Sequence, residues 1–581
     1  METVNLFSSA VILCFLVLTG TILFPAIKGV TEEVSWAIRL ALAIGLLFLI
    51  GWVDFVMNLR WWSSLLLLPL SLFVFIVRFI EVKALFTSKV MRPVLIAYLL
   101  LLGILLLHMS VQVLYFGGGW AVDWIEHYHR ASFFGENRDF GTKFAGYALT
   151  ARPPLVNILA AQMLSIFGVQ FFTYQVVMTL YGSLLFFPLA GLISHFKNGE
   201  VTKRSVFLLA FLLAGTPMFI QNIVFPWTKM VCSVFVLSGL LVFLKYLSSN
   251  GWRWAGLAYM LMGFAFVAHY SAGPYIVGMV AAQLFWHRKR WRDYEFAREF
   301  MVGGITGALV VFLWWGWALH IFGIAGTFLT NTTITASTGE GVGGFLAKVC
   351  YNMWTTFVPY SWRAIPAWAH EICLAPDGLL ALRDQFFNLY QVNFFWAIGP
   401  GVCAIWLYAL FQKRVWASFH QEGSLVMFWF VYGAISLFLG VAVHGAIDHM
   451  GLAHICLQPI VYMIIAHVAA VFFEQPRYWK IGLIGSWGMG WFCGVQLNVM
   501  AQGFINLSSR SPLYYFDPNN VPFNLMNNLR TKVDFSIEMV GDLWPYPSWA
   551  YLSLSILLLL VLAYLSCQCD EKHFFLKRAF G

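Results

Sequence analysis

The chain alternates between long apolar runs and short polar loops rich in Lys and Arg. A membrane-spanning helix needs about 20 predominantly apolar residues, and about 15 runs come close to that length. We therefore predict an all-α polytopic membrane protein, because helices satisfy their own backbone hydrogen bonds in lipid. The predicted helices cover 8–28, 35–56, 62–80, 93–115, 170–195, 204–222, 229–247, 253–269, 272–287, 300–322, 392–412, 424–444, 450–472, 479–500 and 548–566.

One apolar segment, Pro153 to Gly168 (PPLVNILAAQMLSIFG), is too short to span comfortably. If it spanned, every later basic loop would change sides. We predict a re-entrant or surface helix near 153–168, which is tolerated where protein surrounds it. Its two prolines suit a helix N-terminus, and that end of a helix attracts anions.

Basic loops fix the orientation, since cytoplasmic loops carry an excess of Lys and Arg. With the basic clusters inside, the long outer loops are 116–152, 323–390 and 501–547. The chain is 60% hydrophobic and only 10% charged, against about 25% charged in soluble domains. The net charge is +9, and the excess of positive charge lies in the short basic loops between apolar segments. We therefore expect membrane lipids and no nucleic acid as partners. The clusters are Lys83/Lys89/Arg92, Lys197/Lys203/Arg204, Arg288–Arg292 and Lys413/Arg414.

The stretch 117–155 is the most polar part of the chain and interleaves charges with aromatic rings. Asp123 and Glu126 are three residues apart, so a helix places both carboxylates on one face. They are either solvated interfacial charges or a general base that activates a hydroxyl. We predict that Asp123 is the base, with Glu126 as the second catalytic candidate.

Three cations are candidates for holding a phosphate. Arg152 directly precedes the Pro153-Pro154 helix, and a guanidinium matches phosphate oxygens. Lys143 is a weaker candidate in the same loop, and Lys229 begins a helix on the outer side. The alternative for Arg152 and Lys229 is a side chain that extends to the headgroups.

A second polar group lies at outer helix ends. The sequence HGAIDHMGLAH has side chains suited to zinc or manganese, so a divalent metal stays open although we name no metal ligand and no firm cofactor. Intramembrane ionisable residues more often line a cavity. The predicted cavity-lining residues are His127, His269, Tyr270, His444, Asp448 and His449. Cys350 and Cys373 both lie in the outer loop 323–390, and a disulfide between them is an open alternative.

The segments DWIEHYHRASFF and ARPPLVNILAAQMLSIFG, followed by a long helix and a basic turn, resemble the GT-C superfamily of membrane glycosyltransferases. The most similar branch holds the protein O-mannosyltransferases and lipid A aminoarabinose transferases, and the match covers about 93–250. The resemblance implies that Asp123 is the base and that Arg152 contacts the donor phosphate. The family often has Glu directly after the Asp, where this chain has Trp124, and Lys229 stands where one branch has a carboxylate.

Together these features predict a transferase that moves a sugar from a polyprenyl-phosphate donor to a hydroxyl of a glycan, lipid or protein. One displacement would invert the anomeric centre. We place the active site on the outer face of a bacterial inner membrane. The predicted regions are 1–92 (extra N-terminal helices), 93–322 (catalytic module with loop 116–152), 323–390 (outer region) and 391–581 (C-terminal helices with loop 501–547).

Two alternatives remain open at this point. The first is a transporter or flippase for a lipid-linked or anionic substrate, although we find no internal repeat of the kind many transporters show. The second is a polysaccharide polymerase or ligase, for which Arg363 and His370 are candidates. The sugar, the acceptor, the polyprenyl length and the oligomeric state are not specified by these patterns.

Overall fold

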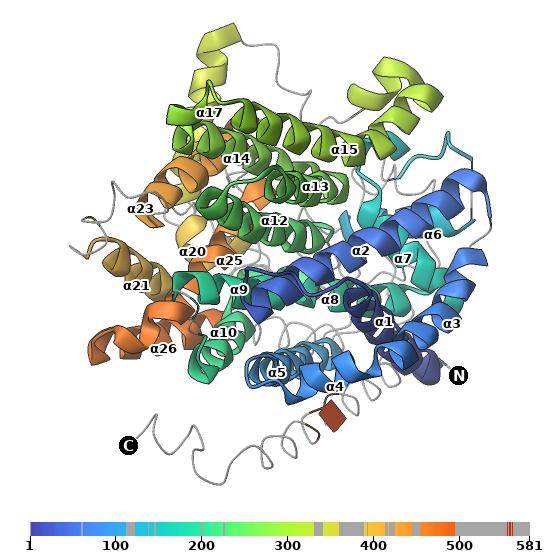
Figure 1. The fold of residues 1–581 in the computed structure, drawn as a ribbon, viewed down its shortest axis with the longest axis horizontal. Helices are drawn as coiled ribbons and strands as arrows, with labels where there is room; N and C mark the ends of the chain where they lie inside the picture. The colour runs from blue at the N-terminus through green and yellow to red at the C-terminus, as the bar shows by residue number, and fades with distance from the viewer. Residues whose placement is uncertain are drawn as a thin grey trace, which may run out of the picture.

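The computed structural model describes residues 2–493 except 60–61, 112–122, 137–138, 145–146, 198, 200, 225–226, 331–340, 359–388, 392, 413–415, 417–424 and 444–453, together with 555, 557–558 and 561. Within these residues the only β-type pairing is an isolated bridge between Phe144 and Tyr147. The predicted all-α class is therefore confirmed for the described part of the chain (Figure 1).

Five helices form the N-terminal part. Where we predicted one helix over 62–80, the structure has α3 and α4, which meet at an angle of 70°. The break lies at Arg78, whose φ of −103° and ψ of 19° leave the helical region. The helices are α1 (Glu2–Leu23), α2 (Glu32–Met57), α3 (Trp62–Val77), α4 (Phe79–Thr87) and α5 (Met91–Val111).

The central part runs from the polar loop to α15, which covers 35 residues and is kinked at Gly323, where φ is 68° and ψ is −175°. The short helix predicted at 153–168 is present as α7, with 13 residues. The predicted helix 204–222 is instead two helices bent by 72°, because Pro217 has no N–H to continue the ladder. The elements are α6 (Asp123–Glu136), η2 (Leu149–Ala151), α7 (Leu155–Phe167), α8 (Phe171–Ser183), α9 (Phe186–Phe196), α10 (Lys203–Gly215), α11 (Pro217–Val224), α12 (Lys229–Ser249), α13 (Trp252–Ala268), η3 (Tyr270–Ala272), α14 (Gly273–Trp286), η4 (Arg288–Arg290) and α15 (Tyr294–Phe328).

The C-terminal part is more interrupted. The predicted helix 392–412 is broken at Gly399, whose φ of 91° favours glycine. A π-helical segment, η5, joins α23 to α24. Nearly all of the predicted helix 548–566 lies outside the described residues. The elements are α17 (Gly341–Phe357), α20 (Phe394–Ile398), α21 (Pro400–Leu410), α23 (Leu425–Phe428), η5 (Trp429–Gly433), α24 (Ala434–Val443), α25 (His454–Val471), η6 (Phe472–Glu474) and α26 (Arg477–Trp491).

Helix α12 lies at the centre of the bundle and is buried over most of its length. It packs on α2, α8, α9, α13 and α25, and α2 also packs on α7. The N-terminal helices therefore share one core with the central part of the chain (Figure 1).

Small residues allow α13 and α15 to pack most closely. A Cβ on Gly263 would lie 2.8 Å from the carbonyl oxygen of Gly307, and one on Gly307 would lie 3.0 Å from the carbonyl oxygen of Tyr259. Thr306 donates across the same contact to the carbonyl of Gly256 at 2.9 Å. Close backbone approach at small residues is a common way for helices to pack in membranes.

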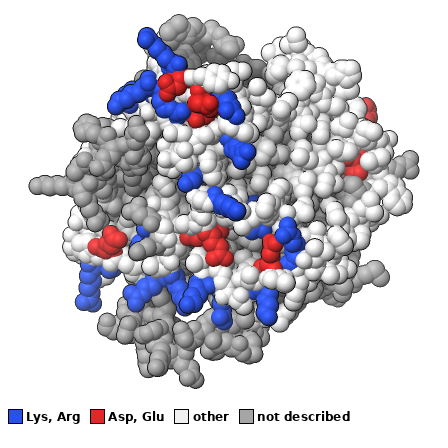
Figure 2. Space-filling model, in the orientation of Figure 1, with Lys and Arg blue, Asp and Glu red and all other residues white. Residues whose placement is uncertain are grey.

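The chain is a multi-pass integral membrane protein. Among the described residues, 5 helices are long and apolar enough to cross a membrane, or up to 7 if each bent pair is one span. The predicted total of about 15 spans is not confirmed. In Figure 2 charged side chains run from top to bottom through the left and centre of the face, and its right-hand side is mostly uncharged.

Candidate active site

A buried ion pair on α6 is the centre of the candidate site. Glu126 and Arg130 are each 1% exposed. The Nε and Nη2 atoms of Arg130 both lie 2.8 Å from Oε1 of Glu126. Their i,i+4 spacing places both side chains on one face of the helix.

Arg130 also connects α6 to the segment that precedes α7. Its Nη1 donates to the carbonyl of Leu149 at 2.8 Å, and its Nη2 donates to the carbonyl of Ala148 at 3.0 Å. The guanidinium carbon lies 4.6 Å from the ring centroid of Phe144. One arginine therefore fixes the position of η2 relative to α6.

Arg152 follows η2 directly and is also buried. Its Nε lies 3.5 Å from Oε1 of Glu126, so one carboxylate faces two guanidinium groups. Its guanidinium carbon lies 4.8 Å from the ring of Tyr147 and 5.9 Å from that of Tyr270. These contacts place Arg152 between α6 and η3.

The first turn of α12 and the turn between α13 and α14 complete the cluster. Lys229 is buried, and its Nζ lies 3.9 Å from the ring of Trp227. His269 ends α13, and its Nδ1 lies 2.8 Å from the hydroxyl of Ser271. Burial lowers the pKa of His269 well below its ordinary value, and the positive charges of Lys229 and Arg152 lower it further. Both positive charges therefore act on the imidazole of His269.

The pKa values of Glu126 and His127 follow from their burial and from the charges next to them. Burial raises the pKa of Glu126, but the charges of Arg152 and Arg130 outweigh it, so its pKa is lowered from the ordinary value. Burial lowers the pKa of His127 to about 3. Glu126 is therefore charged and His127 neutral at neutral pH.

The described structure brings together six of the predicted site residues: Glu126, His127, Arg152, Lys229, His269 and Tyr270. Asp123 begins α6 one turn before Glu126, but its side chain lies outside the described residues. Lys143 is exposed, in contrast to the buried Arg152 and Lys229.

The second polar group lies beyond what the structure describes. His444, Asp448 and His449 all fall in the omitted segment 444–453, and Cys373 falls in 359–388. Across the part of the chain that is described, no three His, Cys, Asp or Glu residues are grouped so that they could hold a metal ion.

Sequence reasoning missed two residues of this site. Arg130 was visible in the loop, and its i,i+4 spacing from Glu126 was the available signal. Asn157, in the first turn of α7, is 1% exposed, and neither atom of its amide group forms a hydrogen bond with a described residue. The sequence contains no local signal for this buried amide, because its position depends on how α7 packs on α6.

Comparison with known proteins gives a partial family match. Residues 151–317 match the model of the family described as dolichyl-phosphate-mannose-protein mannosyltransferase. The resemblance predicted for about 93–250 is confirmed where the two ranges overlap, and the segment DWIEHYHRASFF lies outside the matched residues. No curated protein matches the chain.

Two crystal structures of ArnT from Cupriavidus metallidurans are similar to parts of this chain. The form bound to undecaprenyl phosphate has 14% sequence identity and a TM-score of 0.42, and the alignment covers 80% of this chain and 76% of that one. The apo form has 13% identity and a TM-score of 0.42, with 79% and 74% covered.

Proposed function

We propose that this chain, whose residues 151–317 match a mannosyltransferase family, is a membrane glycosyltransferase that uses a polyprenyl-phosphate sugar as donor. The acceptor is a hydroxyl of a glycan, lipid or protein. The catalytic module in this proposal is 93–322, preceded in the chain by the N-terminal helices of 1–92 and followed by the outer region 323–390 and the C-terminal helices of 391–581. The membrane is the inner membrane of a bacterium, and the reaction takes place on its outer face.

The buried charge cluster is the observation that carries this proposal. Arg130, Arg152 and Lys229 bring cationic side chains to a buried place beside Glu126. Guanidinium and ammonium groups donate charge-assisted hydrogen bonds to phosphate oxygens. They can therefore stabilise a phosphate diester that gains charge as it becomes a leaving group.

Asp123 is the general base in this mechanism. It takes the proton from the acceptor hydroxyl while that oxygen forms a bond to the anomeric carbon. The bond between this carbon and the phosphate oxygen breaks, and the electron pair leaves with the polyprenyl phosphate. Arg152 and Lys229 stabilise its charge, so no strong general acid is needed. A single displacement inverts the anomeric centre.

Glu126 has a different role from the one the sequence suggested first. Two guanidinium groups already occupy its carboxylate, and a carboxylate with a lowered pKa is a weak base. We assign to it the positioning of Arg152. Lys143 is exposed and takes no part in holding the phosphate.

Transfer of radiolabelled sugar tests the proposal. Membranes containing wild type, Asp123→Asn, Arg152→Ala or the control Arg288→Ala receive a panel of polyprenyl-phosphate sugars. Arg288 is exposed at the other end of the bundle, so its variant should match wild type. We expect Asp123→Asn and Arg152→Ala each to reduce transfer by at least about 100-fold, the scale on which acid–base and electrostatic groups act. Full activity in both variants would contradict the mechanism.

A further inference from the structure

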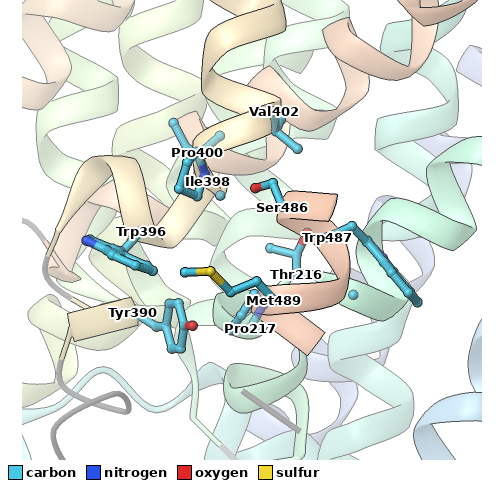
Figure 3. Close-up of a pocket in the computed structure, with 13 residues that line it drawn as sticks. Thr216, Pro217, Tyr390, Trp396, Ile398, Pro400, Val402, Ser486, Trp487 and Met489 are labelled. Atoms are coloured by element: carbon cyan, nitrogen blue, oxygen red, sulfur yellow. The ribbon is translucent and has the colours of Figure 1, made fainter. Parts of the chain in front are cut away.

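Helix α11 is a short half-helix that precedes Lys229 in the chain. It is bent by 72° from α10, because Pro217 interrupts the backbone ladder. All 8 of its residues are buried. A small cavity, whose lining includes Pro217 and Gly399, connects this break with the one that separates α20 from α21 (Figure 3). Helix α10 therefore does not by itself fix the direction of α11.

Two side chains of α8 hold the C-terminal carbonyls of α11. Gln175 donates to the carbonyl of Val224 at 3.4 Å, and Thr179 donates to the carbonyl of Ile223 at 3.2 Å. The last carbonyls of a helix have no partner within that helix, so these bonds satisfy groups that are costly to leave unpaired. They fix the end of α11 that leads to Lys229.

Four side-chain amides connect the last turn of α11 to two further parts of the chain. Asn222 donates to Oε1 of Gln391 at 3.3 Å, and Gln391 donates to Oε1 of Gln221 at 3.3 Å. Gln458 of α25 donates to Oδ1 of Asn222 at 2.8 Å. Each of the four residues is at most 1% exposed. We call them the amide cluster.

Stability alone does not explain the amide cluster. Nε2 of Gln221 and Oε1 of Gln458 are buried and form no hydrogen bond with any other described residue. A partly satisfied buried network is less favourable than a well-packed apolar core. What apolar side chains cannot supply is one fixed arrangement of the helices, because hydrogen bonds have preferred directions.

Helix α8 also contacts the part of the candidate site that contains Arg152. Tyr174 of α8 packs on Tyr128 of α6, with the ring centroids 5.5 Å apart. The same helix α6 carries Glu126, whose Oε1 lies 3.5 Å from Nε of Arg152. One helix thus contacts both α6 beside Arg152 and the half-helix α11 before Lys229.

We infer that the amide cluster, together with Gln175 and Thr179, is a set of positioning residues that hold Lys229 in a fixed place relative to Arg152. This inference rests on the proposed function, in which both cations stabilise the phosphate of the donor. Misplacing a group by about 1 Å can cost about 100-fold in rate, so two cations that share one phosphate need a fixed separation. The positioning residues act through Lys229 and do not themselves touch the substrate.

A double-mutant cycle tests this inference. Membranes that contain equal amounts of each variant receive the polyprenyl-phosphate sugar that wild type transfers fastest, and the initial rate at low donor concentration gives kcat/KM. The variant Asn222→Leu/Gln458→Met replaces a bonded pair of amides by apolar side chains of similar shape, which keeps the loss of stability small. It is made in wild type and in Lys229→Ala.

We expect the amide variant to lower kcat/KM at least about 10-fold in wild type and less than about 3-fold in Lys229→Ala, because its effect passes through Lys229. The matched control is Gln283→Met. Gln283 is a buried amide near the basic turn η4 that donates to the hydroxyl of Tyr246 at 3.0 Å, so its replacement should change kcat/KM by the same factor in both backgrounds.

Equal losses of the amide variant in the two backgrounds, or no loss in wild type, would overturn the inference. Unfolding temperatures identify an amide variant that fails to fold, and Thr179→Val then takes its place, since valine has the shape of threonine without its hydroxyl. If Lys229→Ala matches wild type, the inference is overturned while the proposed function still stands on Asp123 and Arg152. If wild type transfers sugar from no donor, the proposed function fails and this inference fails with it.

Discussion

Glu126 has its charge fixed by two guanidinium groups, and this limits the proton transfers in which it can take part. Arg130 and Arg152 lie 2.8 and 3.5 Å from the same oxygen. A carboxylate in that setting acts as a bridge between cations, since protonation would remove the negative charge that stabilises both contacts. The division of roles between Asp123 as base and Glu126 as bridge follows from this geometry and stays a proposal.

Arg130 is the residue whose replacement best tests this bridge. Its planar group donates to Glu126 and to two backbone carbonyls at once, and Lys has no comparable fork. We expect Arg130→Lys to raise the KM for the donor at least about 10-fold, because Arg152 loses its fixed position. The matched control is Arg288→Lys. Equal KM values in both variants would show that η2 needs no arginine.

His127 gives a pH dependence with a definite sign. Burial, opposed by Glu126 and reinforced by Arg152, lowers its pKa from 6.5 to about 3. Between these values the unfolded chain binds the extra proton, so the stability contribution is complete above pH 6.5 and is lost as pH falls towards 3. At pH 5 the loss amounts to about 2 kcal/mol.

We therefore expect the unfolding temperature of wild type to fall further than that of His127→Asn when the pH is changed from 7.5 to 5. Thermal unfolding of the protein in detergent measures this difference. The control His320→Asn removes an exposed histidine and should follow wild type. Identical pH dependence in wild type and His127→Asn would contradict the buried neutral state of His127.

At the scale of elements, one buried carboxylate joins the ends of four helices. Glu299 of α15 accepts hydrogen bonds from Tyr246 of α12 at 2.8 Å, from the backbone N–H of Gly251 at 2.9 Å and from Arg290 at 3.2 Å. Gln283 of α14 donates to the same tyrosine hydroxyl at 3.0 Å. Because Glu299 is buried, removing these contacts costs more free energy of unfolding than removing a surface ion pair.

Glu299→Ala should therefore lower the free energy of unfolding by about 3 kcal/mol, the cost of leaving a buried partner unpaired. The control Glu295→Ala removes a carboxylate of the same helix that is 60% exposed and pairs with Arg298 at 3.5 Å. Thermal unfolding distinguishes the two. Equal unfolding temperatures would show that this junction contributes nothing to stability.

The contact between α13 and α15 makes a second prediction at this scale. Gly263→Ala places a methyl group 2.8 Å from the carbonyl oxygen of Gly307 and 3.0 Å from the Cβ of Val310. The helices must separate, at a cost of about 1–3 kcal/mol. Gly304→Ala is the control, since its Cβ would meet nothing within 4 Å. A similar unfolding temperature for both variants would refute the close contact.

Sequence patterns predicted the described helices better than their interruptions. Apolar runs located α2, α5 and α12 within a few residues, because a long helix in lipid needs little beyond length and apolarity. The breaks at Arg78 and Gly399 were not predicted, since neighbouring helices compensate for them and no local rule reveals that compensation. The same reasoning applies to the site, where the loop was predicted but the buried position of Asn157 was not.

At the scale of the whole molecule, the candidate site and the basic clusters lie at opposite ends of the same helices. Helix α12 begins with Lys229 at the site and ends at Ser249 after 21 residues, which correspond to about 32 Å. Helix α13 returns to His269, and α14 leads away again to the basic turn η4. The length of α12 matches the hydrocarbon core of a bilayer, so the two ends lie on opposite sides of the membrane.

This arrangement predicts which residues are accessible from each side. Lys143 and Lys289 are both exposed, the first near the candidate site and the second in the basic turn. We introduce Lys143→Cys or Lys289→Cys in a background whose native cysteines are replaced, and treat intact cells with a membrane-impermeant maleimide. The positive-inside rule predicts labelling of Lys143→Cys without permeabilisation and of Lys289→Cys only after it. Sugar transfer by each variant shows that its fold is retained. The reverse pattern of labelling would place the charge cluster around Glu126 in the cytoplasm, where the donor and acceptor would have to be cytoplasmic too.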